Sequence, residues 1–348
     1  MNKVFVSHPR RMLDHYFGAR ATAALRTIAE VRFNQEDREL STAELAAAAH
    51  DADVIIGYRQ TPAPRALFEA LPELVAFLRC AVDIRTIDVA AASEHGVLIT
   101  QASAGFVASV SEWVIGAMLD LARDTSAYAL AYRAGQAPVP RMGRELRGAT
   151  LGVIGYGQIS RYLCGLALAF GMRVIVFDPF ADVTDLRLHQ VDRDTLLGEA
   201  DFVVCLAPAN ADTANFMNAQ AFAAMKPDAF FINAARGELV DDAALLDALE
   251  RGQLAGCALD VGRAADQMPS AALAAHPRVI ATPHVGGLTP GAIEHQSLET
   301  VTQTQALFEG RLPDGAVNAA HASRFAQRVA ARSATRSTTR FDLPEQTR

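Results

Sequence analysis

The sequence predicts an α/β protein with two parallel sheets, each wrapped by helices, and three features of its 348 residues support this. Short β-branched or apolar runs alternate with longer segments of helical period, which is the pattern of a doubly wound sheet. With 51% hydrophobic and 20% charged residues, a chain of this length can bury two cores. The runs also fall into two series, separated by a long apolar-periodic segment at 109–124. We therefore expect two domains.

The first series of runs predicts a small doubly wound domain in the first hundred residues. Its candidate strands lie at residues 3–7, 30–33, 53–57, 75–79 and 96–100. Helical segments separate these runs, for example STAELAAAAH, which begins with residues suited to cap a helix.

The second series begins at TLGVIGYG, residues 150–157, and continues through RVIVFD, DFVVCLAP, AFFINA, GCALDV and VIATPH. Six strands at these spacings, each followed by a turn and most by a helix, fit a dinucleotide-binding domain. Long helices are expected at 109–124 and 291–312. No internal repeat of roughly 20 to 50 residues is visible, which argues against a solenoid or a propeller.

Composition excludes several classes of protein. No apolar run approaches the roughly 20 residues that span a bilayer, and the N-terminus carries no recognisable secretory signal. We therefore expect a cytoplasmic protein without a membrane partner. The cysteines are widely spaced without a CxxC pair, which predicts buried reduced thiols. They are Cys80, Cys164, Cys205 and Cys257.

Charge is distributed unevenly along the chain. The formal net charge is −7, but residues 319–348 hold six arginines against Asp342 and Glu345, which leaves −11 for the rest. An acidic body makes a nucleic-acid partner unexpected. Five of the arginines recur every four residues and would form one stripe on a helix, and we expect a solvated, flexible tail there. They are Arg324, Arg328, Arg332, Arg336 and Arg340.

The stretch GYGQIS has the features of a phosphate-binding turn. It holds Gly155, Gly157 and Ser160 between a strand and a helix, where backbone N–H groups can bind a pyrophosphate. Ser160 replaces the usual third glycine and keeps that position small. The next strand ends in Asp178, which can accept hydrogen bonds from a ribose 2′-OH. No nearby arginine or lysine would hold a 2′-phosphate, so NAD is favoured over NADP.

Three further stretches each follow a candidate strand: NAARG (233–237), ALDV (258–261) and TPHVGG (282–287). The carboxyl ends of the strands in an open α/β sheet border the ligand crevice. Arg236 offers a planar fork of donors for a carboxylate and a neighbouring carbonyl oxygen. His284 can give or take a proton near neutral pH.

These motifs, in this order, resemble those of the D-isomer-specific 2-hydroxyacid dehydrogenases. The resemblance runs from about residue 50 to Asn318 and includes LPELVAFLRCAVDIRTIDVAAASEHGV, SVSEWVIGAMLDLAR, GATLGVIGYGQI, MKPDAFFINAARGELVDDAALLDAL and ALFEGRLPDGAVN. It implies a Rossmann NAD-binding domain, residues 101–289, inserted in a flavodoxin-like substrate domain made of 1–100 and 290–318. It also implies a homodimer formed through helix 109–124 and the segment after it.

The resemblance further implies hydride transfer between NAD(H) and a small D-2-hydroxy acid or 2-keto acid. Arg236 would bind the substrate carboxylate and carbonyl, His284 would be the acid and base, and Asp260 would contact the nicotinamide carboxamide. No metal is needed for this chemistry. The expected cofactor contacts are Gly155, Gly157, Gln158, Ile159, Asp178, Pro208, Thr213, Ala234, Arg236, Asp260, His284 and Gly286.

The family's glutamate partner of the catalytic histidine is missing. Its position falls on Ala265, and the nearest acid is Asp266, one residue later. Three readings stay open: Asp266 replaces the glutamate, His284 works alone or with help from Gln267, or the site is inactive. We favour Asp266 as a third catalytic residue.

The substrate residues implied by the resemblance are Arg59, Ala81, Val82 and Asp83, together with Arg236 and His284. Arg59 matches a phosphate-contacting arginine of phosphoglycerate enzymes, but a second basic residue is absent and Phe106 stands where a polar residue would help. We therefore rank glyoxylate or hydroxypyruvate above 3-phosphoglycerate. An NAD-binding sensor or corepressor with little turnover is the alternative from another class, and formate or phosphite oxidation is less favoured.

Overall fold

The computed structural model describes residues 2–264 and 267–338, which form two compact units. One unit consists of the residues up to Gly105 together with those from Pro290 onward, and the other is Phe106–Thr289. The substrate domain expected from the sequence ended at residue 100, and the unit extends five residues further. Both units are built on parallel sheets, which confirms the α/β fold class.

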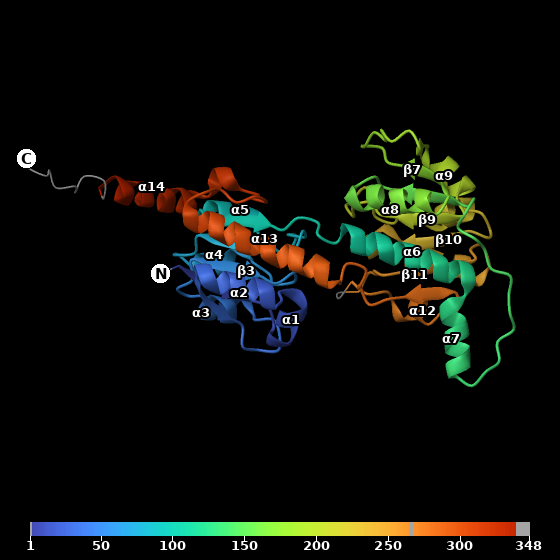
Figure 1. Cartoon of the computed structure of the whole chain (residues 1–348), viewed down its shortest axis with the longest axis horizontal. Helices are drawn as coiled ribbons and strands as arrows, with labels where there is room; N and C mark the ends of the chain where they lie inside the picture. Colours follow the sequence, from blue (N-terminus) through green and yellow to red (C-terminus); the bar gives the residue numbers. More distant parts are fainter. Residues whose placement is uncertain (1, 265–266, 339–348) are drawn as a thin grey trace, which may run out of the picture. The chain divides into compact units, whose positions relative to one another are not determined.

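The first unit contains a five-stranded parallel sheet in the order β2-β1-β3-β4-β5. This is the order of flavodoxin-like domains, in which the topological switch point lies between β1 and β3. The loops that follow these two strands therefore border the ligand-binding edge of this sheet. The strands are β1 (Lys3–Val6), β2 (Glu30–Phe33), β3 (Val54–Gly57), β4 (Ala76–Arg79) and β5 (Leu98–Gln101). Figure 1 labels β3 of this sheet among the helices of the unit.

Helices cover both faces of this sheet because successive strand residues point to opposite sides. Val4 and Val6 pack with α2 and α13, whereas Phe5 packs with α3, α4 and α5. A capping box between Ser41 and Glu44 fixes the start of α3. The helices of the unit are η1 (Arg10–Met12), α1 (Leu13–Tyr16), α2 (Ala19–Ile28), α3 (Thr42–Ala48), α4 (Arg65–Ala70), α5 (Val89–Glu94), α13 (Pro290–Glu309), η3 (Ala319–His321) and α14 (Ser323–Thr338).

The C-terminal segment differs from the solvated tail that the sequence predicted. Its beginning is not a solvated tail, because Phe325 is buried in the core of the first unit. Arg324 donates to the carbonyls of Leu71 and Leu74 at 2.8 and 2.9 Å, and Arg328 is bonded to the Asp53 carboxylate. Two members of the arginine stripe therefore attach α14 to the domain.

The second unit contains a seven-stranded parallel sheet in the order β12-β11-β10-β9-β6-β7-β8. If β6 is taken as the first strand, this is the strand order of a Rossmann fold. The topological switch point then lies between β6 and β9. Six of the strands match the expected runs, but the two-residue β8 was not predicted. The strands are β6 (Thr150–Ile154), β7 (Arg173–Phe177), β8 (His189–Gln190), β9 (Phe202–Cys205), β10 (Phe230–Asn233), β11 (Gly256–Leu259) and β12 (Val279–Ala281).

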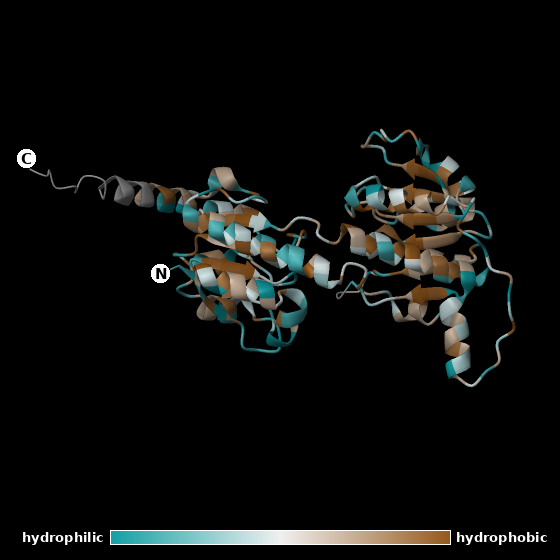
Figure 2. Ribbon diagram, viewed as in Figure 1, coloured by the Kyte–Doolittle hydropathy of each residue, from teal (hydrophilic) through white to brown (hydrophobic). Residues whose placement is uncertain are grey.

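Two helical layers enclose this sheet. One layer consists of α6 and α8, and the other of α9 to α12. Hydropathy colouring shows apolar strands at the centre of each unit (Figure 2). The helices are α6 (Val107–Arg123), α7 (Thr125–Arg133), α8 (Gln158–Ala169), α9 (Arg193–Glu199), α10 (Ala219–Ala224), η2 (Gly237–Leu239), α11 (Asp242–Glu250) and α12 (Ala271–Ala274).

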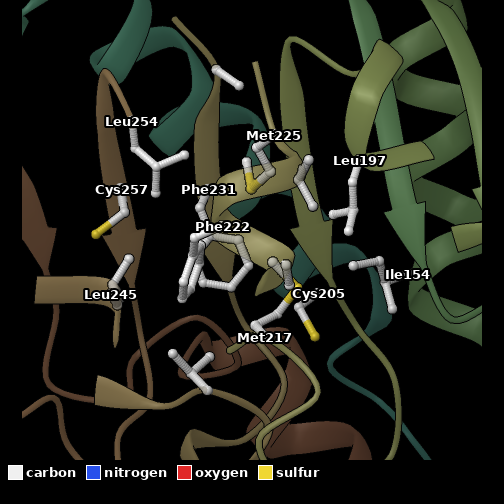
Figure 3. Close-up of a cluster of buried hydrophobic side chains, with 14 of the residues drawn as sticks. Ile154, Leu197, Cys205, Met217, Phe222, Met225, Phe231, Leu245, Leu254 and Cys257 are labelled. Atoms are coloured by element: carbon white, nitrogen blue, oxygen red, sulfur yellow. The ribbon is translucent and has the colours of Figure 1, made fainter. Parts of the chain in front are cut away.

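The core beneath α9 to α12 is rich in aromatic and sulfur-containing side chains. Phe222 and Phe231 meet edge to face with ring centroids 5.4 Å apart (Figure 3). Cys205 and Cys257 lie in the same cluster. All four cysteines are buried and unpaired, as expected, and burial raises the pKa of the Cys205 thiol to about 12. Within the described ranges, no helix is long and apolar enough to cross a bilayer.

Candidate active site

The turn between β6 and α8 has the shape that a bound pyrophosphate requires. Gly155 has a φ of +91°, and a β-carbon placed on it would lie 2.8 Å from the Cα of Ala207. Only glycine avoids both the backbone strain and the clash. A β-carbon on Gly157, the residue before α8, would meet nothing within 4 Å. These residues fit the phosphate-binding role expected of them.

Asp178 fixes this turn against the loop after β7. One carboxylate oxygen accepts from the N–H of Tyr156 at 2.7 Å, and the other accepts from Phe180 and Ala181 at 2.8 and 3.1 Å. The expected ribose ligand therefore lies beside the glycine turn. Its carboxylate shapes the two loops that border the switch point.

The other expected cofactor contacts lie on neighbouring segments of the same unit. Gln158 and Ile159 are the first two residues of α8. Thr213 donates through its hydroxyl to the carbonyl of Pro208 at 2.8 Å and so closes the loop after β9. Ala234 follows β10 directly.

Ser160 is fully buried, and among the described residues its hydroxyl has no hydrogen-bond partner. This agrees with a small packing residue in place of the third glycine of the motif.

Arg236 follows β10 on a tight turn held by Asn233. The Asn233 side chain accepts from Ala235 N–H at 3.0 Å and donates to the Arg236 carbonyl at 2.9 Å. The Arg236 guanidinium donates to the Ala235 carbonyl at 2.7 Å and is half-buried. Asn233 is 1% exposed, so the asparagine that opens the NAARG stretch forms the turn that presents the arginine.

His284 follows β12 in a left-handed conformation, with a φ of +55°. Such a conformation in a residue other than glycine costs about 1 kcal/mol or more and persists where neighbouring contacts impose it. The buried carboxylate of Asp260 imposes it here. It accepts from the Thr282 hydroxyl at 2.6 Å and from the N–H groups of Val285 and Gly286 at 2.8 and 2.7 Å.

The two glycines after His284 let its turn approach its neighbours. A β-carbon on Gly286 would lie 2.7 Å from the Asp260 carboxylate, and one on Gly287 would lie 3.2 Å from the Cβ of Phe106. Trp113, from α6, also borders Gly286. The TPHVGG stretch is thus a turn closed around one buried acid.

Adjacent strands bring these groups to one edge of the sheet. Asp260 follows β11, which lies between β10 and β12, and its N–H donates to the Asn233 carbonyl at 3.1 Å. Neighbouring strands are about 4.8 Å apart, so the turns of Arg236 and His284 start about 10 Å from each other.

The expected third catalytic residue, Asp266, and its neighbour Ala265 lie outside the described residues. The loop that carries them is closed at its base, where Gly262 N–H donates to the Gln267 carbonyl at 2.8 Å. Arg263 anchors the same loop by donating to the carbonyls of Val240 and Glu238 at 2.8 and 3.0 Å. The partner of His284 therefore stays a prediction.

The expected substrate residues of the first unit follow β3 and β4. Arg59 lies with its guanidinium 5.6 Å from the ring centroid of Tyr16. Ala81, Val82 and Asp83 are half-buried in the loop after β4. The Asp83 carboxylate pairs with Arg85 at 2.8 Å, so the charges at these two positions partly cancel within the loop.

Sequence reasoning did not identify Asn233, Thr282 or Trp113 as parts of the site. Each belongs to a stretch that was singled out, but Thr282 and Trp113 contact residues of another segment, and Asn233 acts through the turn that it forms with Ala235 and Arg236. Within the described ranges, no group of three or more His, Cys, Asp or Glu side chains is arranged to hold a metal ion.

The chain is similar to proteins of known family. Residues 115–286 match the family model of the D-isomer specific 2-hydroxyacid dehydrogenase, NAD binding domain, which confirms NAD as the cofactor. The chain is 31% identical to a hydroxypyruvate reductase of Thermotoga maritima, over 78% of this chain and 92% of that protein. It is 32% identical to a D-3-phosphoglycerate dehydrogenase of Synechocystis, over 80% of this chain but only 51% of the relative.

The chain thus spans about half the length of that phosphoglycerate dehydrogenase. Among solved structures, a D-lactate dehydrogenase with NAD+ from Lactobacillus jensenii matches with a TM-score of 0.78 and 26% identity, covering 90% of this chain and 99% of that one. Because the likeness to the hydroxypyruvate reductase extends over nearly all of that protein, the chain belongs to the D-isomer-specific 2-hydroxyacid dehydrogenase family.

Proposed function

We propose that this protein is an NAD-dependent dehydrogenase that interconverts a small 2-keto acid and the corresponding D-2-hydroxy acid. The observation that carries the proposal is the turn after β12. There Asp260 accepts three hydrogen bonds and holds His284 in a left-handed conformation, two strands from the turn of Arg236. Residues held in sparsely populated backbone conformations cluster at active sites and ligand-binding segments.

Arg236 and His284 have complementary roles in this proposal. The Arg236 guanidinium binds the substrate carboxylate and polarises the adjacent carbonyl through its planar fork of donors. His284 donates a proton to the carbonyl oxygen as negative charge develops there, and accepts it from the alcohol in the reverse direction. Bound NADH supplies the hydride for the reduction.

The cofactor residues favour NAD over its 2′-phosphorylated form. The carboxylate of Asp178 lies beside the glycine turn at the end of β7 and would repel a phosphate placed there. Gly155, Gly157 and the first turn of α8 would receive the pyrophosphate. Asp260 is proposed to orient the nicotinamide carboxamide region through the same turn that it holds.

Glyoxylate and hydroxypyruvate are the favoured substrates, with Arg59, Ala81, Val82 and Asp83 contributing from the first unit. Arg59 lacks the second basic residue that would help it to bind a phosphate, and the side chain of Phe106 offers no hydrogen-bond donor. 3-Phosphoglycerate stays a second candidate because Arg59 is half-exposed on the Tyr16 ring and because phosphoglycerate dehydrogenases are among the relatives.

The test is oxidation of NADH by the purified chain with a panel of 2-keto acids, including glyoxylate, hydroxypyruvate, pyruvate and 3-phosphohydroxypyruvate. We expect turnover of at least one small keto acid. In His284→Gln, kcat/KM should fall by about a thousandfold because general acid catalysis is lost. His189→Gln, which alters an exposed histidine of the same unit, should leave kcat/KM unchanged.

The outcome that contradicts the proposal is tight binding of NADH, measured by fluorescence, with no turnover of any keto acid. That result would favour the NAD-binding sensor. Turnover of 3-phosphohydroxypyruvate alone would favour the phosphoglycerate enzyme.

We also propose that the chain assembles as a homodimer. Helix α7 and the segment after it stand off the rest of their unit (Figure 1). They expose large apolar side chains, which on a monomer would stay in contact with water. These are Leu130, Tyr132, Val139 and Met142, at 64%, 68%, 79% and 98% exposure.

A further inference from the structure

Arg79 is a charged side chain in the interior of the first unit. It is the last residue of β4 and has no exposed surface. Burial lowers the pKa of its guanidinium to about 10, so the group still carries its charge at neutral pH. A buried charge is costly unless hydrogen bonds satisfy it, which raises the question of what Arg79 binds.

The guanidinium joins two loops. One terminal nitrogen donates to the Tyr58 carbonyl. The other donates to the Thr61 carbonyl at 2.7 Å and to the Thr86 hydroxyl at 2.8 Å. Tyr58 and Thr61 belong to the loop after β3, whereas Thr86 belongs to the loop after β4.

The loops held in this way carry all the proposed substrate residues of the first unit. Arg59 lies between Tyr58 and Thr61, and residues 81–83 lie between Arg79 and Thr86. Both loops lie at the carboxyl edge of the sheet, and β3 borders its switch point.

The bonds of Arg79 go to carbonyl and hydroxyl oxygens, and none of them to a carboxylate of a described residue. The nearby acid Asp83 pairs with Arg85 instead. A lysine has no planar fork, and its three donors leave one nitrogen, so it would not reach the acceptors of both loops with the same geometry. An arginine at this position is therefore suited to set the spacing between the loops.

We propose that Arg79 is a positioning residue for substrate binding, which holds the loop of Arg59 and the loop of residues 81–83 at a fixed spacing. This inference rests on the dehydrogenase function proposed above. Arg79 does not touch the reacting atoms, since it is enclosed in the first unit. Its loss should weaken the binding of the 2-keto acid and leave the hydride-transfer step largely intact.

The experiment compares three variants by steady-state kinetics, with the keto acid and NADH varied separately. Arg79→Lys removes the fork, and Thr86→Val removes only the bond to the second loop. Arg324→Lys is the matched control, because Arg324 also donates to two carbonyls of this unit, at 2.8 and 2.9 Å, but in the connection before β4.

In Arg79→Lys we expect the KM for the keto acid to rise about tenfold, with kcat and the KM for NADH changed by less than about threefold. Thr86→Val should raise the keto acid KM by about threefold. Arg324→Lys should leave all three parameters at the values of the unaltered enzyme. Thermal unfolding of each variant checks that the fold is kept.

The inference would be overturned if the KM for the keto acid were unchanged in both Arg79→Lys and Thr86→Val. It would also be overturned if kcat of these variants fell while the KM for the keto acid stayed the same. If Arg79→Lys does not fold, Thr86→Val decides alone, because Thr86 is exposed and its substitution leaves the core intact. Failure of the proposed function gives a different result, namely no turnover of any keto acid by the unaltered enzyme.

Discussion

Among single residues, His8 illustrates how burial decides the charge state of a side chain. It follows β1, is 1% exposed, and lies edge-on to the rings of Phe17 and Tyr58 at 5.3 and 5.2 Å. Burial lowers the pKa of His8 to about 3, and the positive charge of Arg79 adds to the effect. The folded protein therefore keeps this histidine neutral at pH values where an unfolded chain would protonate it.

This difference predicts acid sensitivity of the fold. Below pH 6.5 the unfolded state binds a proton at His8 that the folded state takes up only near pH 3, so unfolding becomes more favourable as the pH falls. Between pH 6.5 and 4, His8 should remove up to about 3 kcal/mol from the free energy of unfolding.

Urea unfolding at several pH values measures this contribution. His8→Gln should lose less stability over the same range, because glutamine does not titrate. His321→Gln, which alters an exposed histidine of the same unit, should keep the pH dependence of the unaltered protein. Equal slopes for His8→Gln and the unaltered protein would contradict the assignment.

Among the structural elements, the turn after β12 is held by three hydrogen bonds to one side chain. Asp260 is buried, with 3% of its surface exposed. The three donors to its carboxylate all lie within residues 282–286. The left-handed conformation of His284 lies in the middle of this segment. The conformation of this turn is therefore held by a residue that follows the neighbouring strand, β11.

Asp260→Asn should destabilise this turn. In asparagine an NH2 group replaces one of the two accepting oxygens of the carboxylate, and it would face an N–H or O–H donor of the turn. We expect a loss of about 2 kcal/mol or more in the free energy of unfolding and a fall of about a hundredfold in kcat/KM for keto acid reduction. Unfolding curves and steady-state kinetics measure the two effects.

Asp192→Asn is the control for this change. Asp192 likewise accepts from a backbone N–H and a threonine hydroxyl, both of Thr195, but at the start of α9. Asparagine also caps helices well, so stability and activity should be kept. Full activity in Asp260→Asn would show that the turn does not need the carboxylate.

For the whole molecule, the proposed dimer predicts a change of mass on substitution. Leu130→Ser together with Tyr132→Ser removes two exposed apolar side chains of α7. Light scattering should give the mass of two chains for the unaltered protein and of one chain for the double variant. Leu312→Ser, in the other unit and 54% exposed, should leave the dimer intact. A monomeric unaltered protein would contradict the proposal.

Much of the architecture could be predicted from local patterns. Apolar runs identified eleven of the twelve strands found in the described residues, because buried parallel strands are apolar along most of their length. The exception, β8, has only two residues and both are exposed, so it leaves no hydrophobic signal. The periodic arginines led to the wrong prediction that the beginning of the C-terminal segment is a solvated tail. Arg324 and Arg328 bond to groups more than 200 residues away, which no local pattern reveals.

The sequence by itself determined the fold class and NAD as the cofactor, and it led to the proposal of Arg236 and His284 as the catalytic pair, because all of these depend on short motifs at the ends of strands. Only the tertiary structure decided how those residues are held. The bonds of Asp260 to the His284 turn and of Arg79 to two loops join segments that become neighbours only when the strands pair. Hydrogen bonds depend on distance in space, and the chain order does not encode that distance directly.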